Sequence, residues 1–266
     1  MAQKIGILHD GGLKDLALSL PDLSRFHQSQ QDTHITFITK RPYVDVANQS
    51  GYFNAVWDAP MPLGRNILSW FIFRLRLKGF GFDKIYSTGK QKPPLVATDP
   101  LPDQNGKVLK GWCQRDISFY QLPNRFALIH VPEKDEDTWS ATRMGTLCKK
   151  ISQDKITPIL IGKSADTRAI ERIEKICPTA LDFTGQIDWL DMVALGHHAL
   201  FCIGHDRPDL YLIAFADCPV LCLISDKDEL PDQPPKGKKV VCLQDSLHSL
   251  PVKTVYDLLQ EHEFYG

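Results

Sequence analysis

The sequence predicts an α/β protein built from two Rossmann-type halves. Short apolar runs alternate with helical patterns along the chain, which is typical of parallel sheets covered by helices. The chain has 266 residues, more than a typical single domain, and 43% of them are hydrophobic, which is ample for buried cores. Neither half contains G-x-G-x-x-G or G-x-x-x-x-G-K-[ST], which argues against a nicotinamide-binding fold and a P-loop.

The first half opens with a β-rich run, Ile5-Gly6-Ile7-Leu8, followed by a helix whose apolar positions include Leu16, Leu20 and Leu23. We expect Pro21 to interrupt or redirect this helix. The strands predicted for this half are 4–8, 34–38, 55–58 and 84–86, and the helix is 13–26. For the second half we predict strands at 126–130, 157–161, 200–203, 219–223 and 239–243, with helices at 142–151 and 253–263.

The segment Ile67 to Lys78 is apolar, with Arg74, Arg76 and Lys78 toward its end. The favoured interpretation is a helix packed on the first sheet, with its cations at the C-terminal end as the helix dipole prefers. The alternative is an interfacial helix that contacts a membrane, with aromatic side chains inserted and cations on anionic headgroups.

Composition excludes some classes of protein. Lys and Arg number 31 against 32 Asp and Glu, so the chain has no large basic field that would suggest a nucleic-acid partner. Its seven cysteines include no C-x-x-C pair, and we interpret them as buried, reduced thiols. The N-terminus lacks the apolar core of a signal peptide, and no apolar run is long enough to span a bilayer, so a cytoplasmic protein is expected.

The most informative pattern is a strand ending in Phe201-Cys202-Ile203, a turn, and a helix opened by Pro208. A helix start presents unpaired backbone N–H groups and the positive end of the helix dipole. In an open parallel sheet this turn lies at the carboxyl edge of the strands, where anions bind. Neighbouring His197-His198, Cys202 and His205 raise a metal site as an alternative, but their spacing gives no ligand pair, and no metal is expected.

The segment from Pro158 to Ser225 resembles the donor domain of family 9 glycosyltransferases, the ADP-heptose:lipopolysaccharide heptosyltransferases. Pro158-Ile159-Leu160-Ile161-Gly162-Lys163 is similar to the family's strand and glycine turn, and Phe183-Thr184-Gly185 to its next turn. The family's final signature is roughly Asp-Thr-Gly-Pro-x-His. This chain keeps Asp206 but has Arg207, Pro208, Asp209 and Tyr211 where Thr, Gly, Pro and His are usual.

The resemblance extends to the N-terminus, where Ile5 to Pro21 is similar to the family's opening strand, glycine loop and first helix. Asp15 matches the family's general base, a carboxylate that takes the proton from the acceptor hydroxyl. From the residues alone, Asp15 can equally be an acidic residue that favours the first turn of a helix without catalysis.

The remaining predicted site residues would contact a nucleotide-sugar donor. Arg207 offers a bidentate phosphate contact, Tyr211 one hydrogen bond, and Asp206 a carboxylate for ribose hydroxyls or for fixing its turn. Asp166 is either a ribose ligand or, more simply, the N-cap of the helical run that follows it. Asp209 would repel a diphosphate. The predicted donor-binding set is Gly12, Lys14, Gly162, Lys163, Asp166, Thr184, Gly185, Asp206, Arg207, Pro208 and Tyr211.

What the resemblance implies is a GT-B-like arrangement, two Rossmann-type domains facing across a cleft. Residues 1–122 would form the acceptor-side domain, 123–250 the donor domain, and 251–266 a helix packing back toward the first domain. The implied activity is inverting, metal-independent transfer of a heptose-like sugar, with no cofactor, from a nucleotide-diphosphate donor such as ADP-heptose. The acceptor would be a cell-envelope glycan or lipopolysaccharide, reached at the inner face of the cytoplasmic membrane.

A second hypothesis is an inactive descendant that keeps the fold as a binding or assembly module. It is motivated by the altered segment from Asp206 to Tyr211. The family's lysine shortly before a tryptophan is also missing, because Lys134 stands in the wrong register before Trp139.

Overall fold

The computed structural model describes residues 3–30, 32–62, 66–88, 95–102, 112–113, 115–133, 139–163 and 167–265. It divides into two compact units, Met1–Cys113 and Gln114–Gly266. Each unit is a parallel sheet with helices on both faces, so the predicted α/β class with two Rossmann-type domains is confirmed.

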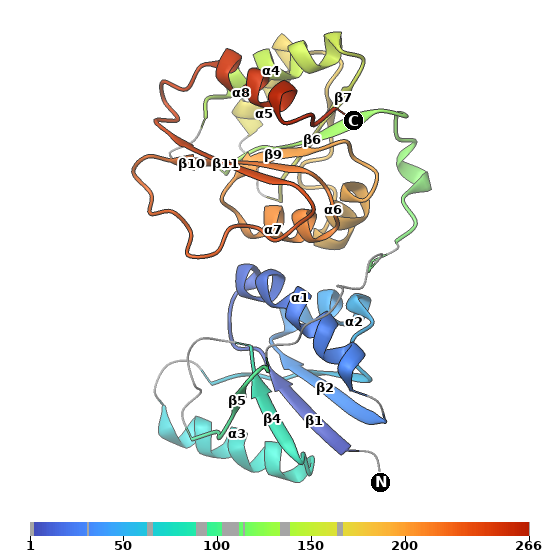
Figure 1. Ribbon diagram of the computed structural model, residues 1–266, viewed down its shortest axis with the longest axis vertical. Helices are drawn as coiled ribbons and strands as arrows, with labels where there is room; N and C mark the ends of the chain where they lie inside the picture. Colours follow the sequence, from blue (N-terminus) through green and yellow to red (C-terminus); the bar gives the residue numbers. More distant parts are fainter. Residues whose placement is uncertain are drawn as a thin grey trace. The chain divides into compact units, whose positions relative to one another are not determined.

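The first unit contains a sheet with strand order β3-β2-β1-β4-β5, and all its described pairings are parallel. Its helices lie on the two faces, α1 and α2 on one and α3 on the other (Figure 1). The elements are β1 (Gln3–Leu8), α1 (Leu13–Ser29), β2 (Thr33–Thr39), α2 (Val44–Ser50), β3 (Ala55–Asp58), α3 (Ile67–Gly79), β4 (Lys84–Ser87) and β5 (Asp99–Pro100).

The second unit contains a sheet with strand order β11-β10-β9-β6-β7-β8, again parallel. This order places β6, the unit's first strand, beside β9, its fourth. The elements are β6 (Phe126–His130), α4 (Ala141–Gln153), β7 (Thr157–Ile161), α5 (Thr167–Ile176), β8 (Leu181–Asp182), α6 (Trp189–Gly196), β9 (Cys202–His205), α7 (Pro208–Phe215), β10 (Val220–Ser225), β11 (Val240–Asp245) and α8 (Val252–Glu261).

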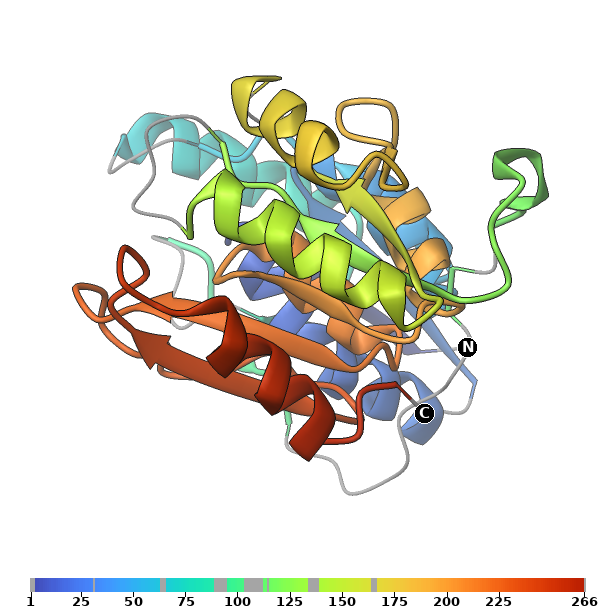
Figure 2. The same cartoon turned by 90° about the horizontal axis from the view of Figure 1, so that it is seen from above.

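Two apolar clusters cover the faces of this second sheet. One joins α4, α5 and α8 to the sheet and includes Trp139, Leu147 and Leu259. The other joins α6 and α7 to the opposite face and includes Leu195 and Ile213. The two layers of helices are visible above and below the strands in Figure 1, and Figure 2 shows α4 and α8 lying over the sheet from the side of the first cluster. Strands buried on both faces explain the continuous apolar runs in the sequence.

Three local features differ from what the sequence predicted: the course of α1 at Pro21, the exposure of one cysteine, and two short strands. Helix α1 runs uninterrupted through Pro21, which is buried, because packing of this face outweighs the missing backbone hydrogen bond. Six of the seven cysteines are buried and free as expected, but Cys242 on β11 is exposed. Two short strands, β5 and β8, give too little apolar pattern to be predicted.

The division between the units lies nine residues before the predicted boundary of 122/123. The reason is that Ile117, Tyr120 and Leu122 pack into the apolar cluster under α6 and α7, so the connecting segment belongs to the second unit. Helix α8 was expected to pack toward the first domain. Within the second unit α8 contacts α4, and Val255 and Leu259 lie in that unit's own core. Its packing toward the first domain stays a prediction.

Candidate functional site

Each sheet has a point where the strand order reverses, and the predicted site residues that follow β1 and β9 lie at these points. In the first unit the chain runs from β1 outward in both directions, so the reversal lies between β1 and β4. In the second unit it lies between β6 and β9. In open α/β sheets the crevice outside the carboxyl ends of such neighbouring strands binds ligands.

In the first unit a buried histidine fixes the loop after β1. The Nε2–H of His9 donates to the Gly12 carbonyl at 3.2 Å, so its Nδ1 accepts the hydroxyl of Thr88, which follows β4, at 2.7 Å. Burial lowers the pKa of His9 to about 4, so the ring is neutral at pH 7. Lys40 Nζ donates to the Asp10 carbonyl at 2.8 Å. Three side-chain hydrogen bonds, to Gly12, Thr88 and Asp10, therefore fix the loop after β1.

Asp15 lies in the first turn of α1, directly after this loop. Its Oδ2 accepts the backbone N–H of Gly12, the N-cap residue, at 2.8 Å, which is the half of a capping box that the N3 side chain supplies. The side chain is exposed, and within the described residues Oδ1 has no hydrogen-bond partner. Asp15 therefore caps the helix, as the simpler interpretation expected, and keeps one oxygen free. Gly12 is the N-cap of α1 and Lys14 lies beside Asp15 in the same turn.

In the second unit the turn after β9 is fixed by its own side chains. The hydroxyl of Tyr211, which is buried, donates to Asp206 Oδ1 at 2.7 Å, and the backbone N–H of Arg207 donates to the His205 carbonyl at 2.7 Å. Burial and the neighbouring carboxylate raise the pKa of Tyr211. The Tyr211 hydroxyl thus holds Asp206 in place, and it also lies 3.3 Å from the Gln233 carbonyl.

The N-terminus of α7 begins at Pro208, with Arg207 as its N-cap. The Nε2–H of His130, the last residue of β6, donates to Asp209 Oδ2 at 3.2 Å across the reversal point. Asp209 is mostly buried, so a carboxylate of the protein lies in the first helical turn where an anion would be stabilised. Arg207 Nη2 lies 3.6 Å from Glu133 Oε1, and this half-exposed pair is a weak interaction.

A second buried histidine lies at the end of β9. Nε2 of His205 accepts the backbone N–H of Trp139 at 3.1 Å, so the proton of the neutral ring is on Nδ1. Burial lowers the pKa of His205 to about 3. Within the described residues, Nδ1 of His205 and Nδ1 of His130 are buried without a hydrogen-bond partner. Unpaired buried polar atoms are uncommon, and here two lie at the ends of adjacent strands.

The turns after β7 and β8 form a second group, separated from the β9 turn by β6. The N–H of Gly185 donates to the Gly162 carbonyl at 2.8 Å, and both glycines have positive φ, 68° and 146°. Thr184 donates from its N–H and its hydroxyl to Asp182, which accounts for this turn without a ligand. Lys163 Nζ lies 4.7 Å from the ring centre of Trp189. Asp166 lies outside the described residues.

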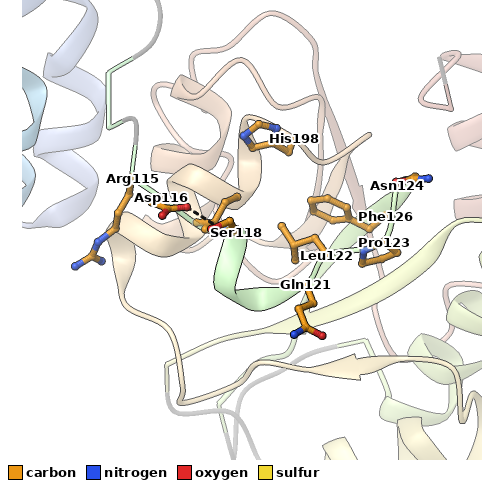
Figure 3. Close-up of a pocket in the computed structure, with 10 residues that line it drawn as sticks. Arg115, Asp116, Ser118, Gln121, Leu122, Pro123, Asn124, Phe126 and His198 are labelled. Carbon is orange, nitrogen blue, oxygen red and sulfur yellow. Dashed lines mark hydrogen bonds between the residues drawn. The ribbon is translucent and has the colours of Figure 1, made fainter.

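A pocket of ≈ 630 Å³ lies at the opposite end of the second sheet. Leu122, Pro123 and Phe126 gather along it, and His198 borders it (Figure 3). Phe126 begins β6 and His198 precedes β9, so the pocket is at the amino ends of the strands and contains none of the predicted site residues. We therefore place the candidate site at the carboxyl edge, on the strand-order argument.

The described residues form neither a metal-binding cluster nor a membrane-spanning helix. Residues 3–62, 66–88, 95–102, 112–133, 139–163 and 167–265, with their short gaps, contain no group of three or more His, Cys, Asp and Glu side chains arranged to hold a metal ion. Within the same part of the chain, no helix has the length and apolar character needed to cross a membrane.

Sequence reasoning missed the histidines that organise both reversal points. His9 directly follows Ile5-Gly6-Ile7-Leu8, and His130 closes Phe126-Ala127-Leu128-Ile129. The available signal was a histidine at the end of the first apolar strand of each half. Asp209 was recognised as a charge in the helix start, but its partner His130 was not.

No family model matches the sequence. No curated protein matches it either. Solved structures do. The glycosyl transferase family 9 protein from Veillonella parvula aligns with a TM-score of 0.76 at 12% identity, covering 98% of this chain and 97% of that one. The ADP-heptose lps heptosyltransferase II of E. coli aligns at 0.71 and 13% identity, covering 98% of each chain.

The chain has the fold of family 9 glycosyltransferases. A third structure, E. coli heptosyltransferase WaaC with ADP, aligns at a TM-score of 0.70 and 12% identity, covering 98% of this chain and all of that one. The family 9 fold therefore extends over both units, and the predicted GT-B-like class is confirmed. At these identities the likeness concerns the fold and does not extend to individual site residues.

Proposed function

We propose that the protein is a glycosyltransferase that moves a heptose-like sugar from a nucleotide-diphosphate donor to a cell-envelope glycan or lipopolysaccharide acceptor, with inversion. The observation that carries the proposal is the match of nearly the whole chain to nearly the whole of family 9 structures. One of those structures contains ADP, which supports a nucleotide-sugar partner here.

In this proposal Asp15 is the general base. The acceptor oxygen forms a bond to the anomeric carbon, the bond from that carbon to the donor phosphate breaks, and the acceptor proton passes to the free Oδ1 of Asp15. The cap to Gly12 and the contacts of His9 orient the carboxylate, so it requires no rearrangement before reaction. The exposed position of Asp15 leaves it accessible to an acceptor.

The second unit would hold the donor. The start of α7, with Arg207, would stabilise the charge that develops on the leaving nucleoside diphosphate, so no metal ion is needed in this proposal. Asp206, fixed by Tyr211, would accept hydrogen bonds from ribose hydroxyls. The turns at Gly162, Lys163, Thr184 and Gly185 would approach the nucleoside, and the unpaired Nδ1–H of His205 would be satisfied by a ligand oxygen. We propose that the reaction uses no cofactor. We also propose that the protein acts at the inner face of the cytoplasmic membrane.

The test separates nucleotide binding from chemistry. Calorimetry with ADP and other nucleoside diphosphates, in the presence of a chelator, should give binding heat. Asp15→Asn should leave nucleotide affinity and thermal stability nearly unchanged, because the amide oxygen still accepts from Gly12, while transfer falls by about 10²-fold or more. Transfer that survives Asp15→Asn would remove Asp15 from the mechanism.

A second candidate function is supported by the contact between His130 and Asp209. A carboxylate already lies in the first turn of α7, which favours a descendant that keeps the fold as a binding or assembly module. No heat with any nucleoside diphosphate would support this module and exclude the transferase.

A further inference from the structure

Helix α3 of the first unit has two apolar faces. One face is buried against the sheet through Trp70, Phe73 and Leu77. The packing on the sheet expected from the sequence is therefore present. The other face is also apolar, and its side chains are between 47 and 72% exposed: Ile67, Leu68, Phe71, Ile72 and Leu75. Single exposed apolar side chains are ordinary, but five on one helix face mark an interaction site.

The positions of these side chains around the helix axis are regular. At about 100° per residue, the exposed apolar side chains occupy an arc of roughly 140° centred opposite the buried stripe. Arg74 lies at one edge of this arc and Arg76 at the other, and Lys78 lies within it near the end of the helix. All three cations are exposed, and none has an acidic partner among the residues that the structure describes. Phe80, just past the helix, is a further exposed aromatic side chain.

The stretch of chain between Asp58 and Asp83 is positively charged. From Ala59 to Phe82 the chain contains four cations, Arg65, Arg74, Arg76 and Lys78, and no Asp or Glu, although the whole chain is near neutral. A second copy of this chain is a poor occupant for the face, because a self-interface would bring the same cations together. An anionic surface is complementary. Long cationic side chains at the edges of an apolar arc can extend to headgroups while the arc inserts.

We propose that the exposed face of α3, formed by Ile67, Leu68, Phe71, Ile72 and Leu75 and flanked by Arg74, Arg76 and Lys78, is the surface by which this protein binds an anionic lipid bilayer. The helix lies parallel to the membrane, with its apolar arc among the acyl chains and its cations at the headgroups. Binding of the bilayer by this surface requires neither a nucleotide nor catalysis. The membrane-binding proposal is therefore independent of the transferase proposal.

The experiment is co-sedimentation of the full chain with vesicles of phosphatidylcholine alone and of phosphatidylcholine mixed with phosphatidylglycerol. We expect strong binding to the mixed vesicles only, weakened by added salt. Replacing Arg74, Arg76 and Lys78 together by Gln should lower the affinity about a hundredfold, since each cation near an anionic surface contributes about fivefold. The control is Lys149→Gln, Lys175→Gln and Lys253→Gln, which removes equal charge from exposed positions in the second unit and should change little.

The apolar arc is tested by Leu68→Ser, Phe71→Ser and Leu75→Ser together, which should abolish sedimentation with the mixed vesicles, and by Phe71→Ser alone, which should weaken it about tenfold. Phe119→Ser with Leu230→Ser, exposed apolar residues of the second unit, is the control. Three results would overturn the proposal: no vesicle binding by the native chain, equal binding to both vesicle types, or dimerisation in solution that Phe71→Ser removes. Calorimetry with ADP in the absence of lipid decides the transferase proposal separately.

Discussion

A histidine bridges the reversal point of each sheet. His9 contacts Thr88 and His130 contacts Asp209, and in both pairs the partners are 79 residues apart. In the first unit the contact leaves an exposed carboxylate, Asp15, with a free oxygen. In the second unit the contact with His130 holds the carboxylate of Asp209 at the start of α7. The histidine contact therefore accompanies an accessible carboxylate, Asp15, in the first unit. In the second unit it holds a carboxylate, Asp209, in the first turn of a helix.

Asp209→Asn tests this difference. The substitution removes a negative charge from the first turn of α7 and keeps an oxygen for His130, so ADP affinity should rise about tenfold, with little change in stability. Calorimetry with ADP measures the effect. Asp257→Asn on α8, an exposed position outside the candidate site, removes the same charge and serves as control. Unchanged affinity in Asp209→Asn would show that the carboxylate does not oppose a phosphate.

Cys242 is a second residue whose chemistry can be tested. It is level with Cys222 on the neighbouring strand, and the hydrogen bond from Cys222 lowers the pKa of Cys242 to about 7. Since thiolates are the reactive form, iodoacetamide should label Cys242 first, with a rate that rises with pH and levels off about one unit above 7. Cys222→Ala should move this midpoint upward, toward the ordinary value of about 8.5. Faster labelling of any buried cysteine would contradict the assignment.

At the scale of elements, the close approach of β6 and β9 decides the geometry of the reversal point. Gly204 on β9 faces β6, and a Cβ there would lie 2.8 Å from His130 Cβ and 3.1 Å from Leu210 Cδ1. Leu210 Cδ1 is the end of a flexible side chain on α7 and can move, but His130 Cβ is attached directly to the backbone of β6, so this strand would have to shift. Glycine is thus required for packing at this position.

Gly204→Ala should lower the free energy of unfolding by about 1–3 kcal/mol, because overpacking displaces His130 and with it the contact to Asp209. Urea denaturation measures this loss. Gly79→Ala, at the end of α3, where a Cβ meets nothing within 4 Å, is the matched control and should be neutral or slightly stabilising. Equal effects of the two substitutions would show that β6 and β9 tolerate wider spacing.

At the scale of the molecule, His9 in the first unit and His205 in the second are buried histidines whose rings are neutral at pH 7. Burial lowers the pKa to about 4 and about 3, respectively, from an ordinary value of 6.5. Below pH 6.5 the unfolded chain binds protons that the folded chain does not. The stability contributed by each neutral ring is therefore complete above pH 6.5 and is lost as the pH falls toward the folded pKa.

Both units should accordingly lose stability in mild acid. At pH 5 the loss relative to pH 7 is about 2 kcal/mol for each histidine. Hydrogen exchange with mass spectrometry reports on each unit separately. After correction for the slower intrinsic amide exchange at pH 5, both units should show lower protection factors at pH 5 than at pH 7. His9→Gln should remove this pH dependence from the first unit and leave it in the second. Equal protection at pH 5 and pH 7 would contradict the assignment of two neutral rings.

The sequence by itself determined the α/β class, most strands to within two residues, and the turns that carry Asp15, Gly162, Gly185 and Asp206. These features depend on local periodicity, helix-start chemistry and a motif resemblance, all of which are contained in short stretches of chain. Tertiary structure alone decided which polar groups meet, because contacts such as His130 to Asp209 depend on strand order. It also decided that the second apolar face of α3 stays exposed, since periodicity cannot tell which of two apolar faces a core will cover.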